Sequence, residues 1–556
     1  MARLKLLAKI LRFRLGHATS KSEKVETRKD VEEELVREAI EVSRKRATQR
    51  LVFKDYRVVE SYPLNPPWAY ARILENVKTG EKLYYVDEVP LSEAEQKIYK
   101  NIMRILYWEI KPPPSNVDPQ EYFVREAKRI VIEYRLKLGR TPGITWSKIL
   151  YYVVRDVAGF GPIDPLMRDP HIEDISCNGL GRPIYVWHRR YEYIPTNIVF
   201  EDEEELDSLV VKLVHMAGKH ISVAFPVVDA ILPGGHRLAA TYKKEVSTSG
   251  STFTIRKFRE DPITIVDMLR GGVIDPLVGA YLWLLVEHKM AGMIMGVTGA
   301  GKTSTLNALA TLLRPNLKVV TIEDTPELRL PLKNWVQLVA RPSYGIGAEK
   351  IGEITLFDLV KVSLRYRPDI IVVGEVRGEE AYVLFQAMAI GHGGMTTLHA
   401  EHIDAAVKRL TSPPMNIPPS YIPLMRFALL IRRVVMESEE GSRVVRRVTH
   451  VWEIVDYNNY KLIVEWDPRK DEHILKQSES TLLREIIEFK GKDWDWVEEE
   501  LSRRAVVLQY MLARGIRYYK DVAAIVYKYY AQPHSIYTEA RNYLASHEIK
   551  LVNPIA

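Results

Sequence analysis

The stretch Gly-Val-Thr-Gly-Ala-Gly-Lys-Thr at residues 296–303 constrains the fold of this chain more than any other. It matches the phosphate-loop pattern G-x-x-x-x-G-K-S/T at every fixed position. The apolar residues 293–295 before it predict a short buried strand, and the leucines of 303–313 lie on one face of a predicted helix. An ordinary glycine-rich turn would need neither flanking element. A strand, a glycine-rich loop and a helix in this order direct backbone N–H groups and the positive helix end at a phosphate.

The loop predicts binding of ATP with Mg²⁺. Lys302 can reach the β- and γ-phosphates, and the Thr303 hydroxyl can ligate Mg²⁺. The glycines let the backbone curl around the phosphates. The remaining predicted nucleotide contacts are Gly296, Thr298, Gly299, Ala300, Gly301 and Ser304.

Two apolar segments that end in acids predict strands beside this loop. Residues 369–375 read as a strand buried on both faces, with Glu375 at its carboxyl end, where ligands bind in parallel sheets. Glu375 can orient water or hold Mg²⁺ through water, or it can simply cap a helix. Residues 319–324 end in Glu323 and Asp324, either of which could position or deprotonate the attacking water. This second signal is weaker, because many strands end in an acid.

A glycine-rich stretch at 391–400 carries two histidines. His392 and His399 could sense the γ-phosphate, or they could only shape the loop. His399 and His402 could also be metal ligands, but no third ligand is spaced nearby. The metal interpretation is therefore disfavoured, while phosphate sensing and loop shaping both stay open for His392 and His399.

The composition excludes several kinds of protein. Cys177 is the single cysteine, so an internal disulfide and a Cys₂ or Cys₄ zinc site are excluded, and a reducing cytosolic setting is favoured. No apolar run reaches about 18 residues, so we expect no transmembrane helix. The first 20 residues are too charged for a signal peptide. A net charge of +7 is modest for 556 residues and does not by itself indicate nucleic acid.

A chain of this length predicts about two to four domains. Residues 1–50 are basic, and their first part has the pattern of an amphipathic helix. Such a helix could bind an acidic membrane surface or dock on a partner, or the segment could be a solvated tail. A proline-rich linker at 111–115 separates two small α+β regions, and the strand–helix–strand pattern from 262 to about 470 predicts a parallel sheet covered on both faces. The predicted parts are a partly mobile segment 1–50, N-terminal domains 51–115 and 116–260, an ATPase domain 261–475 and a helical region 476–556.

Four motifs in order resemble the secretion ATPase superfamily. They are the phosphate loop, the acidic strand 321–327, the strand 369–377 and the histidine stretch 391–400, which look like the Walker A, Asp-box, Walker B and His-box elements. The resemblance covers roughly residues 140–470. The strands around 68–91 and the tail at 500–516 look most like the archaeal branch. The fold implied is α/β: a RecA-like P-loop NTPase domain, with smaller α+β domains before it and a helical tail after it.

The resemblance also implies roles for two arginines of the N-terminal region. Arg237 and Arg256 match family arginines that reach the ATP, although the interpretation of Arg237 as a solvated surface charge stays open. Ile231 stands where some members carry a further arginine, which leaves the number of arginine contacts open. The tetracysteine metal module of many bacterial members is absent, as the single cysteine requires.

The function implied is an ATP-hydrolysing motor that drives assembly of a type IV pilus-like filament, or type II-like secretion, across a membrane. Glu323, Glu375, Arg237, Arg256 and His399 are the catalytic candidates. The partners implied are five further copies in a homo-hexamer, a polytopic membrane platform protein and, indirectly, pilin-like subunits, at the cytoplasmic face of the membrane. A nucleic-acid motor for conjugation or DNA transport is the alternative, which the basic N-terminus would suit. A regulatory scaffold without turnover is disfavoured, because both Glu323 and Glu375 are present.

Overall fold

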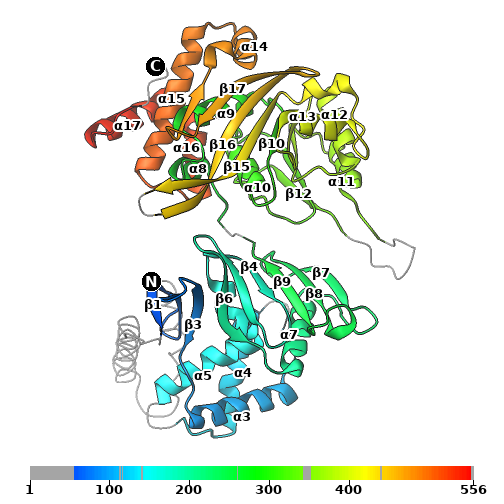
Figure 1. The fold of residues 1–556 in the computed structure, drawn as a ribbon, viewed down its shortest axis with the longest axis vertical. Coiled ribbons are helices and arrows are strands. Elements are labelled where there is room, and N and C mark those ends of the chain that lie inside the picture. Colours follow the sequence, from blue (N-terminus) through cyan, green and yellow to red (C-terminus); the bar gives the residue numbers. More distant parts are fainter. Residues whose placement is uncertain are drawn as a thin grey trace, which may run out of the picture. The chain divides into compact units, whose positions relative to one another are not determined.

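The structure is a computed structural model that describes residues 55–111, 114, 117–138, 142–258, 261–341, 352–438 and 441–551. The chain divides into two compact units, the first ending at Phe258 and the second beginning at Arg259 (Figure 1). Each unit contains a nine-stranded sheet within its described residues. The predicted basic segment 1–50 and part of the proline-rich linker lie outside the described residues. The division into five parts stays a prediction.

The first unit is built on the sheet β1-β2-β3-β6-β5-β4-β9-β8-β7. Neighbouring strands pair antiparallel, except that β3 meets β6 through one parallel pair, Tyr84 with Thr196. In β7, β8 and β9 buried residues alternate with more exposed ones, so one face of these strands packs on the core, whereas β2 is buried on both faces along most of its length. The strands are β1 (Tyr56–Asn65), β2 (Ala69–Asn76), β3 (Lys82–Glu88), β4 (Ile172–Cys177), β5 (Pro183–His188), β6 (Glu192–Val199), β7 (Val227–Ile231), β8 (Arg237–Thr241) and β9 (Thr252–Arg256). The helices are α3 (Glu93–Glu109), α4 (Pro119–Glu133), α5 (Pro142–Val157), α6 (Asp164–Arg168) and α7 (Glu203–Met216).

The second unit is built on the sheet β12-β11-β13-β14-β10-β15-β16-β17-β18. The six neighbouring strands β12, β11, β13, β14, β10 and β15 are all parallel. This confirms the predicted parallel sheet. Beyond β15 the sheet continues with three antiparallel strands, where the sequence pattern had predicted only strand–helix–strand units. The strands are β10 (Gly292–Met295), β11 (Val319–Glu323), β12 (Trp335–Val339), β13 (Ile370–Val373), β14 (Gly393–Leu398), β15 (Phe427–Ser438), β16 (Gly441–Asp456), β17 (Asn459–Asp467) and β18 (Glu472–Leu475).

Both faces of β10, β11, β13 and β14 are buried, whereas the edge strand β12 is half-buried. Met293 and Met295 of β10 face one hydrophobic core and Ile294 faces the other, as the two-residue period of a strand requires. One face is covered by α11 (Leu356–Leu364), α12 (Glu380–Ala389) and α13 (Ile403–Thr411) (Figure 1). The other is covered by α8 (Ile265–Arg270), α9 (Pro276–Glu287), α10 (Lys302–Ala310), α14 (Thr481–Lys490), α15 (Trp494–Ala513), α16 (Tyr519–Ala531) and α17 (Pro533–Ser546). Short 3₁₀ helices lie at Gly161–Ile163, Lys243–Glu245, Pro419–Leu424 and Gln477–Glu479.

A buried polar network joins the C-terminal helices to the rest of the second unit. Arg504 of α15 contacts the carboxylates of Glu287 and Glu500, and Glu287 also accepts from Arg314, just after α10. Tyr530 of α16 accepts a hydrogen bond from the Trp283 indole at 2.8 Å and donates one to the Leu312 carbonyl at 2.5 Å. Because both acids and Arg504 are buried, each needs its partners in place. The helical tail is therefore part of the packing that holds α10. None of the described helices has the length and apolar character that a membrane span requires.

Candidate active site

The phosphate loop leaves β10 and enters α10, in the order that the motif predicts. Gly299 and Gly301 have φ of +74° and +103°, the left-handed region in which a side chain is strained. At Gly296 an added Cβ would lie 2.5 Å from the carbonyl oxygen of Ile431, so only glycine fits. The glycines therefore allow both the curl of the loop and its close approach to β15. The other predicted contacts lie in the same loop and in the first turn of α10: Thr298, Ala300, Thr303 and Ser304.

Lys302 folds back under the loop. Its side chain is largely buried, and Nζ donates to the Val297 carbonyl at 3.1 Å. The same Nζ lies 3.2 Å from Nδ1 of His399, at the end of β14. Burial lowers the pKa of Lys302, and the nearby Glu375 carboxylate opposes that shift. The ammonium is thus held next to the turn where a phosphate would lie.

Glu375 completes this group two residues after β13. Its Oε1 lies 3.1 Å from Nε2 of His399, yet it is buried and makes no hydrogen bond within the described part of the chain. Burial disfavours its charged form, but Arg377 and His399 outweigh burial and hold the pKa of Glu375 below its ordinary value. Glu375 is therefore an ionised carboxylate with one oxygen available to accept. The structure brings Lys302, His399 and Glu375 together, as the sequence predicted.

Arg377 is a site residue that the sequence analysis did not single out. It donates to Oε2 of Glu375 at 2.7 Å, and its Nη1 lies 3.9 Å from the Asp324 carboxylate. It therefore links the ends of β11 and β13. The available signal was an arginine two residues beyond a strand-ending acid, where a neighbouring strand also ends in an acid.

Glu323 occupies a different environment from Glu375. Its Oε1 accepts from the backbone N–H groups of Glu327 and Leu328, both at 2.8 Å, and its Oε2 accepts from the Gln337 amide at 2.9 Å. Both oxygens are thus engaged in holding the segment after β11 against β12. Burial raises the pKa of Glu323 to about 7, in spite of these hydrogen bonds. Its catalytic role stays a prediction.

Arg237 and Arg256 lie side by side on the sheet of the first unit. They are direct cross-strand partners on β8 and β9, and both are exposed. Arg237 pairs with Asp229 at 2.6 Å, and Arg256 pairs with Asp174 at 3.1 Å. The two arginines predicted to act together therefore share one surface, each with an acid that a phosphate would have to replace.

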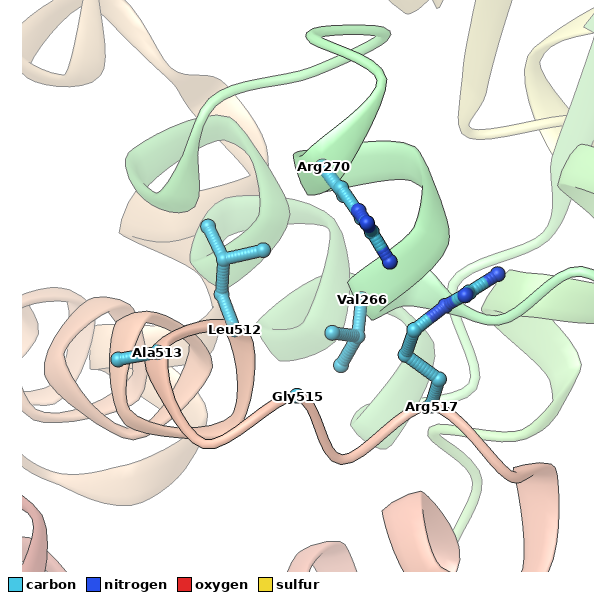
Figure 2. Close-up of a pocket in the computed structure, with 6 residues that line it drawn as sticks. All are labelled: Val266, Arg270, Leu512, Ala513, Gly515 and Arg517. Atoms are coloured by element: carbon cyan, nitrogen blue, oxygen red, sulfur yellow. The ribbon is translucent and has the colours of Figure 1, made fainter.

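A pocket of about 320 Å³ in the second unit contains none of the predicted site residues. It lies between α8 and the turn that follows α15 (Figure 2). Arg517 beside it donates to Asp267 of α8 at 2.7 Å. The lining residues are Val266, Arg270, Leu512, Ala513, Gly515 and Arg517.

Comparison with known proteins places the chain in a family. The sequence profile of the type II/IV secretion system protein family matches residues 156–446, just over half of the chain. The chain belongs to this family. The type II/IV secretion family is the one that the motifs resemble, so that prediction is confirmed, as is the prediction that the chain is an ATPase.

Relatives of this type II/IV secretion protein include archaeal and bacterial chains. An uncharacterized protein of Methanocaldococcus jannaschii is 35% identical over 84% of this chain and 88% of its own length. Type IV secretion system protein PtlH of Bordetella pertussis is 32% identical over 45% of this chain and 81% of its own. Among solved structures, the Legionella pneumophila ATPase DotB is similar over 68% of this chain and 93% of its own, with 17% identity and a TM-score of 0.39.

The environment of Glu323 predicts a pH-dependent stability. A carboxyl whose pKa is raised from 4.5 to about 7 stabilises the fold fully below about pH 4.5, and this contribution disappears as the pH rises through about 7. The shift corresponds to about 3 kcal/mol. Glu323→Gln cannot titrate, so its unfolding free energy should rise relative to wild type between pH 4.5 and 8, by up to about 3 kcal/mol.

Urea unfolding at several pH values, followed by tryptophan fluorescence, measures this difference. Glu479→Gln, at an exposed carboxylate of the same unit, is the control. Parallel pH profiles for wild type and Glu323→Gln would contradict the assignment.

Proposed function

We propose that the chain hydrolyses ATP at the phosphate loop and converts the hydrolysis into mechanical work on a membrane assembly. The observation that carries the proposal is the contact chain Lys302–His399–Glu375 beside the loop. It combines a cation for the phosphates with an ionised carboxylate that has one accepting oxygen. These are the two charges that phosphoryl transfer to water requires.

In the proposed reaction, water attacks the γ-phosphorus and the bond from that phosphorus to the β–γ bridging oxygen breaks, which releases ADP and phosphate. Lys302 neutralises charge on the β- and γ-phosphates, and Oε1 of Glu375 accepts a hydrogen bond from the attacking water. His399 lies between them and so responds to whether Lys302 is engaged by the γ-phosphate. Thr303 and, through water, Glu375 would hold Mg²⁺, which supplies further neutralisation of phosphate oxygens.

The motor acts, in this proposal, as a homo-hexamer on a polytopic membrane platform protein at the cytoplasmic face, and through it on pilin-like subunits of a filament or secretion apparatus. Direct contact with nucleic acid is not part of the proposal. Support comes from membership of the type II/IV secretion family and from the type IV secretion protein among its relatives. Turnover that DNA stimulates, with a steep salt dependence, would favour the nucleic-acid motor instead.

Lys302→Ala should abolish turnover. Removal of the ammonium takes away charge stabilisation of the transition state, and the rate should fall by about a hundredfold to a thousandfold or more. Steady-state release of phosphate measures it, with Lys470→Ala, at an exposed lysine of the same unit, as the control. A turnover rate within about twofold of that of wild type would contradict the proposal.

Arg237→Ala should lower kcat far more than it weakens ATP binding, if Arg237 engages phosphate only as charge develops in the transition state. Arg237→Lys should recover part of the loss, because an ammonium cannot reproduce a planar two-point contact. Turnover and nucleotide affinity are measured in parallel. Arg57→Ala, at another exposed, ion-paired arginine of the first unit, is the control. An unchanged kcat in Arg237→Ala would indicate that Arg237 is a solvated surface charge with no contact to the nucleotide.

The oligomeric state is a separate test. A non-hydrolysable ATP analogue with Mg²⁺ should produce a species of six chains in light scattering and a six-fold ring in electron microscopy. The proposed hexamer rests on the resemblance, with Arg237 and Arg256 as local support. A strict monomer at micromolar concentration under these conditions would contradict it.

A further inference from the structure

The β15–β16 hairpin runs beside the phosphate loop. β15 is paired in parallel with β10, with Leu430 next to Met295, so it continues past the point where the loop begins. Ile431, which follows Leu430 in β15, approaches the loop at two points. Its carbonyl oxygen lies 2.5 Å from where a Cβ of Gly296 would be, and its Cδ1 lies 3.5 Å from where a Cβ of Gly301 would be. The residues of β15 that share the face of Ile431 therefore lie along the loop.

A β-bulge sets which residues of β16 reach that face. Leu430 pairs with His450, but Ile431 pairs with Val448, so Thr449 is skipped. Without the skip, Arg433 would lie opposite Arg447. With it, Arg433 lies directly opposite Arg446, and both project on the face of Ile431. Bulges that redirect side chains are frequent next to active sites.

Both arginines of this pair lie against the bend of the loop. Nε and Nη2 of Arg446 donate to the Gly299 carbonyl, each at 3.3 Å. Nη1 of Arg433 lies 3.9 Å from where a Cβ of Gly299 would be. Arg446 is exposed and forms no ion pair within the described residues.

The neighbouring arginine, Arg447, shows the contrast. Its side chain is buried and forms two hydrogen bonds to the Asp471 carboxylate, at 2.6 and 2.7 Å, and one to the Gly271 carbonyl. Arg447 is thus a neutralised structural residue. Arg433 and Arg446 instead lie directly opposite each other beside the phosphate loop, so that two guanidinium groups lie against the same bend.

We propose that Arg433 and Arg446 form a second phosphate-binding element, contributed by the β15–β16 hairpin of the same chain that carries the phosphate loop. Their ligand is the phosphate chain of the nucleotide bound in this loop. Guanidinium groups suit it because each can present two parallel donors to phosphate oxygens. The proposal rests on the proposed function, since it assigns further residues to the same nucleotide site. The arginines bind ADP as well as ATP and therefore act chiefly on affinity.

The test is calorimetric titration of the full chain with ADP and with AMP, in Mg²⁺, at two salt concentrations. Arg433→Ala and Arg446→Ala should each bind ADP about tenfold to a hundredfold more weakly than wild type, with a flatter salt dependence. AMP binding should weaken less, because AMP offers fewer phosphate oxygens. Arg446→Lys should recover part of the affinity. Arg469→Ala, at an exposed arginine in the turn between β17 and β18, should bind as wild type does.

A purely structural role for the pair predicts different results. If Arg446 only orders the loop, Arg446→Ala should melt at a lower temperature and Arg433→Ala should bind ADP normally. A phosphate-binding role for the pair predicts instead that both variants bind ADP more weakly than wild type. Unchanged ADP affinity in both variants, with Lys302→Ala impaired, overturns this inference alone. If wild type and Lys302→Ala both fail to bind ADP, the proposed function itself fails.

Discussion

The parallel pairing of β10 with both β14 and β15 is the interaction on which the site depends. In a parallel sheet the carboxyl ends of neighbouring strands lie at one edge, so each strand delivers its next residues to the same place. The phosphate loop follows β10 and His399 follows β14, while Ile431 lies within β15 in contact with the loop. Glu375 arrives in the same way from β13, the neighbour of β14. A shift in register would separate these groups without altering any of them.

The two strand-ending glutamates show how burial and hydrogen bonding divide a pair of similar residues. Glu375 lies near the cations Arg377 and Lys302, which keep it ionised, and one of its oxygens makes no hydrogen bond within the described residues. Glu323 has no ion pair within the described residues, and its neighbours are backbone N–H groups and an amide, so burial dominates its pKa. The pKa values of the two carboxylates are therefore shifted in opposite directions.

The phosphate loop and the buried strands could be predicted because each is specified by neighbouring residues. Fixed glycines, an apolar run and a terminal acid are local signals, and the contact of Lys302 with His399 follows once the strands are parallel. The antiparallel extension was missed because the charged residues of β16 and β17 follow no regular two-residue alternation, and the direction in which two strands pair is not specified by either strand alone. The Arg433–Arg446 pair was beyond prediction for a sharper reason: it exists only because the pairing skips Thr449.

The buried network around Arg504 decides where this chain can be shortened. A cut after β18 would remove α14 to α17 and look harmless on the sequence, since the whole nucleotide-binding sheet would remain. The cut would nevertheless remove Arg504, the ion-pair partner of Glu287, and expose Trp283, which is fully buried in the intact unit. The remaining acid would stay in an apolar surface with only Arg314 to compensate it. A fragment that keeps Glu287 and Trp283 buried therefore has to include α15 and α16.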